Sequence, residues 1–306
     1  MTFVKYLIHG WAAKAAFTVV MMAGPAQGAI STGAFYERAL MRTAGERCRL
    51  FSPDIAAALV ASSLQARGAA LRAGASTADL ADVEQRASLR AYGVDCASPD
   101  LATAAMRVRK GFEGYARLSS MRFPGDVAGW QAERVRAFVP TQTVKVAPGP
   151  RWRLAQTAPL PADMVFGIVD GPGPVAVTSD PLAVRASYAR LVMRDPRKAP
   201  APYLDARKPG LSGRIAPRAV STAIFASGKT AAPATLLPGG QTGVGQKTGV
   251  MFSFPPAAAE ALASLDPREA VVVEFVSVGA SGEQVGQAWV EVGDFAAARA
   301  FLAATR

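Results

Sequence analysis

Two cysteines, Cys48 and Cys96, constrain the fold of this chain most strongly, because a bond between them would join positions 48 residues apart. The sequence around them is rich in alanine and poor in β-branched residues, which predicts helices at roughly 33–49, 53–73, 77–93 and 99–117. The cysteines then lie at the first and third junctions, which share one end of an up-down-up-down bundle. We therefore expect a Cys48–Cys96 disulfide that staples a helical bundle.

The second and fourth predicted helices start with the same tripeptide, Ser-Pro-Asp, at residues 52–54 and 98–100. Serine is a favourable N-cap, proline suits the first helical position, and an acid in the first turn interacts well with the helix dipole. After the second copy, apolar residues recur at spacings of four and three, which is typical of one buried helix face. These residues are Leu101, Ala105, Val108, Phe112 and Tyr115.

The first 28 residues have the pattern of a secretory signal peptide. Two lysines precede an uncharged apolar run, Ala15–Ala23, and small residues follow a Gly-Pro break. This run would span only about 14 Å as a helix, against roughly 30 Å of membrane hydrocarbon, so a retained anchor is disfavoured. We expect cleavage after Ala26 or Gly28, a periplasmic or secreted mature chain, and no transmembrane span in it.

The one histidine of the chain, His9, lies within this signal segment. Cleavage would leave a mature chain without imidazole, which excludes Ser-His-Asp and Cys-His catalysis and any zinc or copper site that contains histidine. Two cysteines cannot form a four-thiolate cluster. We therefore expect no metal and no cofactor, and these exclusions favour a non-catalytic binding or structural protein of the cell envelope.

The composition changes near Val139-Pro140, where short runs rich in valine and aromatic residues begin to alternate with Gly and Pro. Val271-Val272-Val273 is apolar on both faces, which indicates a central strand. Two helices interrupt the strands, at 256–265 and 295–303. The predicted strands are 143–146, 151–156, 164–169, 175–178, 188–194, 220–226, 249–254, 271–278 and 287–292.

These patterns predict an α+β protein. We expect a signal peptide over 1–28, a helical bundle domain over 29–139 and an antiparallel β-rich domain over 140–306, which is a sandwich or rolled sheet with two packing helices. A fifth helix, Asp126–Phe138, is expected at the end of the bundle domain.

Residues 185–218 carry 9 basic and 2 acidic side chains, a net charge of +7 within a proline-rich segment. Such a segment can contact an anionic lipid or an anionic envelope polymer, and a solvated loop would have the same composition. Nucleic acid is disfavoured, because an exported protein seldom meets it and the segment has only two aromatic residues for base stacking. No protein partner is indicated. The candidate anion-binding residues are Arg190, Arg194, Arg197 and Lys198.

A carboxylate-dependent envelope hydrolase is the alternative, because paired acids alone can cleave glycosidic bonds. Asp163 and Asp170 flank a predicted strand, while Glu283, Glu291 and Asp294 cluster near the C-terminus. Surface acids and a helix cap at Asp294 explain the same residues. A third hypothesis is an accessory subunit of an envelope complex, which requires an exposed apolar patch.

Two further features are ambiguous. Gly228-Lys229-Thr230 and the glycine-rich stretch 240–248 resemble a phosphate-binding loop but lack its full spacing, so we read them as loops between strands. Trp130, Trp152 and Trp289 fit either a ligand groove or the packing of the core.

Three segments carry a resemblance: CRLFSP at 48–53, QARGAALRAG at 65–74 and VEVGDFAAAR at 290–299. They resemble exported proteins of alphaproteobacteria that have no assigned activity. The resemblance implies export and supplies no functional residue.

Overall fold

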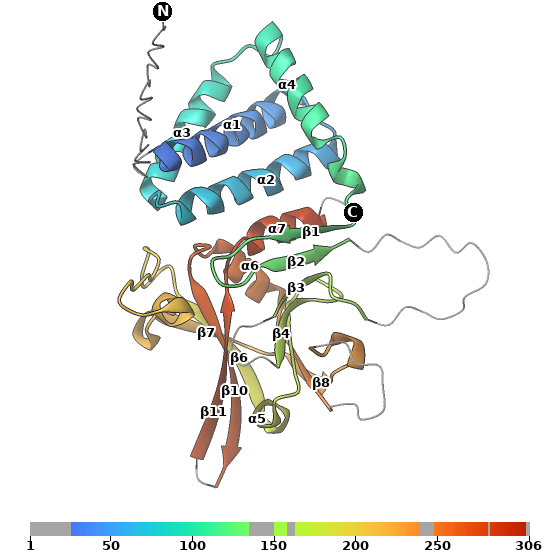
Figure 1. Ribbon diagram of the computed structural model, residues 1–306, viewed down its shortest axis with the longest axis vertical. Coiled ribbons are helices and arrows are strands. Elements are labelled where there is room, and N and C mark those ends of the chain that lie inside the picture. The colour runs from blue at the N-terminus through green and yellow to red at the C-terminus, as the bar shows by residue number, and fades with distance from the viewer. Residues whose placement is uncertain (1–25, 135–149, 158–162, 239–247, 281, 304–306) are drawn as a thin grey trace, which may run out of the picture.

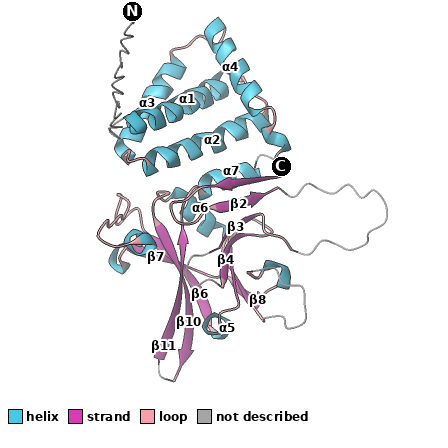
Figure 2. Cartoon of the chain, viewed as in Figure 1, coloured by secondary structure: helices cyan, strands magenta, loops and turns pink. Residues whose placement is uncertain are grey.

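The computed structural model describes residues 26–134, 150–157, 163–238, 248–280 and 282–303. In these ranges, seven α-helices and eleven strands form an α+β protein, as the sequence predicted. Four helices lie at one end of the molecule, above two antiparallel sheets (Figure 1, Figure 2).

The N-terminal helices are α1 (Ala26–Cys48), α2 (Pro53–Arg72), α3 (Thr77–Tyr92) and α4 (Pro99–Phe112). Ser52 and Ser98 occupy the N-cap positions of α2 and α4 without a side-chain hydrogen bond, and the proline that follows each starts the helix. α1 packs against α2 and α3, whereas α4 lies at the margin of this group (Figure 1). Residues 1–25 of the expected signal peptide lie outside the described residues, and both expected cleavage positions fall in the first turn of α1.

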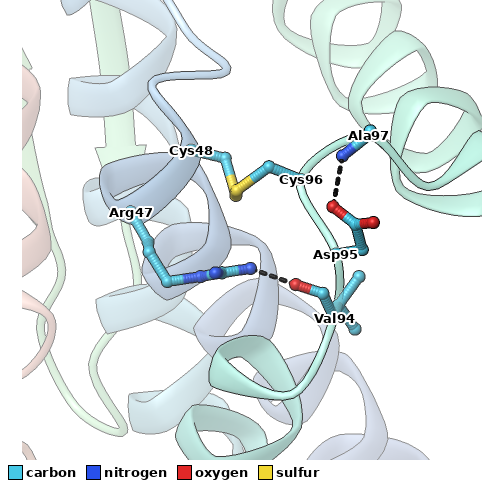
Figure 3. The surroundings of a disulfide bond; sticks show 6 residues. All are labelled: Arg47, Cys48, Val94, Asp95, Cys96 and Ala97. Carbon is cyan, nitrogen blue, oxygen red and sulfur yellow. Dashed lines mark hydrogen bonds between the residues drawn. A yellow bond between two sulfur atoms is a disulfide. The ribbon is translucent and has the colours of Figure 1, made fainter.

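The predicted disulfide between Cys48 and Cys96 is present, and it joins the end of α1 to the loop between α3 and α4 (Figure 3). The Arg47 side chain donates a hydrogen bond to the Val94 carbonyl oxygen in the same loop. The Asp95 carboxylate accepts a hydrogen bond from the backbone N–H of Ala97 at 3.0 Å. The start of α4 is therefore held by a covalent bond and by local hydrogen bonds.

Sheet A has seven strands in the order β1-β2-β3-β4-β5-β9-β8, and all neighbours pair antiparallel. Their bounds are β1 Ser120–Phe123, β2 Trp130–Glu133, β3 Leu154–Thr157, β4 Met164–Ile168, β5 Val175–Thr178, β8 Gly228–Ala231 and β9 Val250–Ser253. The first two strands thus belong to the stretch 29–139 that was expected to be helical throughout.

Sheet B has four strands in the order β11-β10-β6-β7, again antiparallel. Its strands are β6 (Tyr188–Arg194), β7 (Ser221–Phe225), β10 (Ala270–Gly279) and β11 (Gly282–Glu291). β10 lies between β11 and β6, and its three consecutive valines are buried. The prediction of a central strand there is confirmed.

The predicted helix over Asp126–Phe138 is wrong for its described part, which contains β2. Trp130 and Ala132 are buried while Glu133 is exposed, so the apolar residues recur at the period of a strand. The Trp130 indole N–H donates to the Val292 carbonyl oxygen at 2.9 Å, and its ring lies 4.8 Å from that of Phe295. Contacts with the C-terminal part of the chain therefore decide the structure of this segment.

Two more strands, β1 and β8, were not predicted. Every residue of β8 is exposed, so no hydrophobic alternation marks it in the sequence. The predicted strand at 143–146 lies outside the described residues.

The two sheets face each other across one core. The rings of Phe252 in β9 and Phe275 in β10 lie 5.4 Å apart and join the sheets. The core also contains α6 (Pro256–Ser264) and α7 (Phe295–Ala303), the two packing helices that were predicted. A further short helix, α5 (Pro181–Arg185), precedes β6.

α7 connects the helical part to the sheets, because it packs on α2 on one side and on β1 and β2 on the other (Figure 1). Arg72, at the end of α2, pairs with Asp294 before α7 through two hydrogen bonds of 2.8 and 2.9 Å. Burial raises the pKa of Asp294 above its usual value despite this pair. Gly68 makes room for the contact, since a Cβ atom there would lie 2.1 Å from the Asp294 Oδ1.

Tyr115, just after α4, is buried against Phe112, Phe301 and the Arg134 guanidinium. Its hydroxyl group finds no hydrogen-bond partner in the part of the chain that the structure describes. Burial raises the pKa of Tyr115 to about 12. This pKa is above the ordinary value near 10, so the fold has its full stability below pH 10 and loses part of it as the pH rises to about 12, because the buried site disfavours the ionised phenol.

Replacing Tyr115 by phenylalanine should therefore leave stability at pH 8 unchanged or raise it by up to about 1 kcal/mol, because a buried hydroxyl without a partner is removed. It should also flatten the loss of stability between pH 10 and 12. Urea unfolding of both proteins at several pH values measures this. An identical alkaline decline in the two proteins would contradict the assignment.

Candidate functional site

The segment between β6 and β7, residues 195–220, contains two of the four predicted site residues, Arg197 and Lys198, and directly follows Arg194; we call it the basic loop. It extends from the edge of sheet B beside β7 (Figure 1). Leu211 and Ala216 are buried, and Ile215 forms a parallel bridge with Ala270 at the start of β10. The loop therefore covers one end of sheet B and is fixed to it.

Arg194 and Glu269 hold the first end of the basic loop. The guanidinium donates two hydrogen bonds to the carboxylate, at 2.6 and 2.8 Å, and only 5% and 2% of the two side chains is exposed. Arg194 also donates to the carbonyl oxygen of Ala199 at 2.6 Å, while Glu269 accepts from the backbone N–H of Tyr203 at 3.1 Å. Because the buried ion pair also forms hydrogen bonds to the backbone of Ala199 and Tyr203, it fixes the position of the loop backbone.

Arg214 holds the second end. Its Nη1 lies 2.7 Å from Asp126 Oδ2 and 3.4 Å from Glu291 Oε1. The Glu291 carboxylate is fully buried and accepts backbone N–H groups from three consecutive residues, at 2.6 to 2.9 Å: Asp126, Val127 and Ala128. This carboxylate thus connects β11, the turn before β2 and the basic loop.

Between these two ends, four cationic side chains are exposed: Arg197, Lys198, Arg207 and Lys208. The side chains of Arg197 and Arg207 are 91% and 90% exposed. Each lies near an aspartate of the loop, at 3.5 Å from Asp195 and at 3.0 Å from Asp205, and such exposed pairs are weak.

The two loop aspartates are ionised at neutral pH. The backbone N–H of Arg197 is the main cause that lowers the pKa of Asp195. The side-chain hydrogen bond from Arg207 does the same for the pKa of Asp205. The loop keeps a net positive charge because Lys198 and Lys208 are not balanced by a further acid within it.

Arg190 lies on sheet B outside the loop, in a small polar cluster. Glu274 accepts hydrogen bonds from Arg190 at 2.6 Å, from Arg218 at 2.5 Å and from Gln287 at 3.0 Å. The hydrogen bond to Glu274 is the largest cause that raises the pKa of Arg190. The charge of Arg190 is therefore largely compensated by a buried carboxylate.

The four candidate anion-binding residues thus have different surroundings. Arg190 and Arg194 pair with buried carboxylates, whereas Arg197 and Lys198 reach solvent. Sequence reasoning did not single out Arg207 and Lys208, although they contribute to the same local charge excess. Net charge gives no means of separating paired from free arginines, because the paired glutamates lie far away in the sequence.

The acids of the hydrolase alternative do not share a cleft. Asp163 and Asp170 flank β4, and Asp170 is exposed. Glu283 lies at the tip of the β10–β11 hairpin, and Glu291 lies at the other end of β11, about 27 Å away at 3.4 Å per residue. Both carboxylate oxygens of Glu291 also accept backbone hydrogen bonds. The geometry therefore provides no pair of carboxylates for the hydrolase alternative.

Trp130, Trp152 and the glycine-lysine motif that the sequence singled out have structural roles. Trp130 belongs to the core, and the Trp152 indole N–H donates to the Leu236 carbonyl oxygen at 3.1 Å. Gly228-Lys229-Thr230 forms part of β8, and the Lys229 ammonium donates to the carbonyl oxygens of Val184 and Ala186. β8 continues to Ala231, and a three-residue 3-10 helix at Ala234–Leu236 comes next in place of an α-helix, so the motif does not have the geometry of a phosphate-binding loop.

The accessory-subunit hypothesis requires an exposed apolar patch, and three strands of sheet B each have an exposed apolar side chain. Phe225 on β7, Val278 on β10 and Val285 on β11 are 54%, 61% and 40% exposed, and β6 lies between β7 and β10. Among the residues described, no group of three or more His, Cys, Asp and Glu side chains is arranged to hold a metal ion. No helix within the described ranges is long and apolar enough to cross a membrane.

Comparison of the chain with protein-family models, with curated proteins and with solved structures finds no match. Function must therefore be argued from the geometry of this molecule.

Proposed function

We propose that this protein is a non-catalytic component of the cell envelope that contacts an anionic lipid surface through its basic loop. The proposal depends on one observation. Four exposed cations lie on a loop whose ends are fixed by the buried Arg194–Glu269 pair and by the Arg214 contacts. A fixed loop loses less conformational entropy on binding than a free one, so its charges can act together.

Leu204 favours a lipid surface over a soluble anionic polymer. This side chain is 40% exposed, and it lies between the two pairs of cations, Arg197-Lys198 and Arg207-Lys208. Basic side chains are attracted to anionic headgroups, while a neighbouring apolar side chain can enter the boundary with the acyl chains. A polymer without an apolar layer would not use Leu204.

The N-terminal pattern and the disulfide support export to the periplasm or beyond. Disulfides persist mainly in oxidising compartments, and an exported protein faces the lipid surfaces of the envelope. Thiol labelling of intact cells with and without reductant tests this part of the proposal. Cytosolic protein with two free thiols would contradict it.

Vesicle binding tests the lipid contact. We expect the protein to bind vesicles that contain phosphatidylglycerol and not vesicles of phosphatidylcholine alone. Replacing the four loop cations by glutamine should lower the apparent affinity at least about tenfold, because each cation near an anionic surface contributes to attraction. The four changes are Arg197→Gln, Lys198→Gln, Arg207→Gln and Lys208→Gln.

A matched control removes the same charge elsewhere, on α3, on α4 and before β3. Its changes are Arg86→Gln, Arg90→Gln, Lys110→Gln and Arg151→Gln, all at exposed positions. The control variant should bind nearly as tightly as the wild type. Equal losses in the two variants would show that net charge alone acts. Tight binding to an anionic polysaccharide with none to vesicles would contradict the lipid assignment.

A further inference from the structure

We infer that the helical part of the protein has a binding site for one fatty acid, in the groove between α1 and α4. The groove has a volume of about 370 Å³. Its apolar lining comes from α1, α2 and α4, and the main side chains are Tyr36, Leu40, Met41, Leu59, Val108 and Phe112. This site is separate from the basic loop and does not depend on the lipid contact proposed above.

The groove exists because α4 is packed at only part of its length. The loop before it is held by the disulfide, and Leu101 and Ala105 are the two residues of α4 that are buried. Further along, Val108 and Phe112 are only half-buried, although both are apolar and face α1 and α2. An apolar ligand would complete the burial of this face.

The size and lining of the groove select the apolar part of the ligand. Ligand pockets usually have volumes of about 300 to 1,000 Å³, and this groove lies near the lower limit. It has room for one unbranched acyl chain and not for the two chains of a phospholipid. The aliphatic and aromatic lining can exclude water from such a chain.

The charges at the rim select the polar part of the ligand. Arg107 is exposed and makes no hydrogen bond or ion pair with other described residues. Arg38 is half-buried, and its Nη1 donates to the Ser62 carbonyl oxygen at 2.9 Å. Burial lowers the pKa of Arg38, since few nearby groups offset its desolvation. Against these two guanidinium groups the rim has one carboxylate, Glu37.

A fatty acid satisfies both conditions, because its carboxylate can accept two parallel hydrogen bonds from a guanidinium while its chain fills the groove. A neutral alcohol would lack the headgroup contact, and a cationic amphiphile would be repelled by Arg38 and Arg107. The expected order of affinity is therefore fatty acid, then alcohol, then alkylammonium.

Calorimetric titration of the intact, oxidised protein with dodecanoate, below its micelle concentration, tests the chain site. We expect one bound molecule for each protein. Ala104→Trp places an indole in the groove and should weaken binding at least tenfold. Ala102→Trp puts the same side chain on an exposed position of α4 and should leave binding unchanged. If Ala104→Trp does not fold by circular dichroism, Val108→Phe replaces it, with the same expected loss.

Dodecanol and dodecyltrimethylammonium test the headgroup. Arg107→Gln should weaken dodecanoate binding several-fold and leave dodecanol binding unchanged, whereas Arg90→Gln on α3 should change neither. Absence of dodecanoate binding, equal losses in the groove variant and its Ala102→Trp control, or an alcohol or alkylammonium that binds as tightly as dodecanoate would overturn the inference. Binding of phosphatidylglycerol in this groove in place of dodecanoate would overturn it as well.

Discussion

Replacing Arg194 by methionine should lower the free energy of unfolding by about 3–5 kcal/mol. The change removes the partner of Glu269 and leaves that carboxylate buried, with only 2% of its side chain exposed. The backbone carbonyl of Ala199 loses its donor at the same time. Urea unfolding at pH 7 measures the effect, and hydrogen exchange of the Tyr203 amide reports whether the end of the basic loop opens.

Two control variants distinguish the effect of losing the buried Arg194–Glu269 pair from the effect of losing a positive charge. Arg197→Met removes an arginine three positions further along that is 91% exposed, and it should change stability little. Combining Arg194→Met with Glu269→Leu removes the unpaired buried charge and should recover much of the loss, because a well-packed apolar pair often replaces a buried ion pair without cost. A loss below about 1 kcal/mol for Arg194→Met would contradict the anchoring role.

Removing the disulfide should have a similar effect. The Cys48→Ala/Cys96→Ala variant should lose about 4 kcal/mol, because the bond closes a loop with a sequence separation of 48 and restricts the unfolded chain. α4 should respond first, since Leu101 and Ala105 are the residues that it buries. Urea unfolding measures the total loss, and hydrogen exchange measures the loss of protection in α4 against that in β10.

Reduced wild-type protein is the natural control and should behave like the double variant. A stability loss restricted to the variant would indicate poor packing of the alanines and not the loss of the covalent link. Full protection of α4 after reduction would show that the bundle does not depend on the bond.

The parts of the fold that sequence predicted are those with a strong local pattern. The helix starts at Pro53 and Pro99 follow from the Ser-Pro-Asp tripeptides, and the central strand β10 follows from its run of valines. The disulfide followed from the positions of the cysteines at two junctions between predicted helices. For the helix starts and the central strand, a few neighbouring residues contain the information, whereas the disulfide prediction also used the order of the helices.

The parts that sequence missed depend on distant contacts. β2 has four residues, and Trp130 in it is fixed by Val292 and Phe295 near the C-terminus. The Arg72–Asp294 pair joins residues separated by 222 positions. No local rule indicates which side chains meet over such distances.

The candidate site shows the same limit. Arg194 and Arg197 are equivalent in a charge count, yet one is an anchor and the other a surface charge. The difference arises from Glu269, which lies 75 positions from Arg194. Only the folded structure therefore distinguishes the cations that hold the loop from those that can contact a ligand.

The central claim is that Arg197, Lys198, Arg207 and Lys208 make the contact with anionic lipid, and its salt dependence tests this most directly. Binding to phosphatidylglycerol vesicles should be measured at several salt concentrations for the wild type and for the variant with all four changed to glutamine. Because salt screens exposed charges, wild-type affinity should fall steeply with salt, and that of the four-site variant should fall much less. Equal salt dependence in the two proteins would contradict the claim.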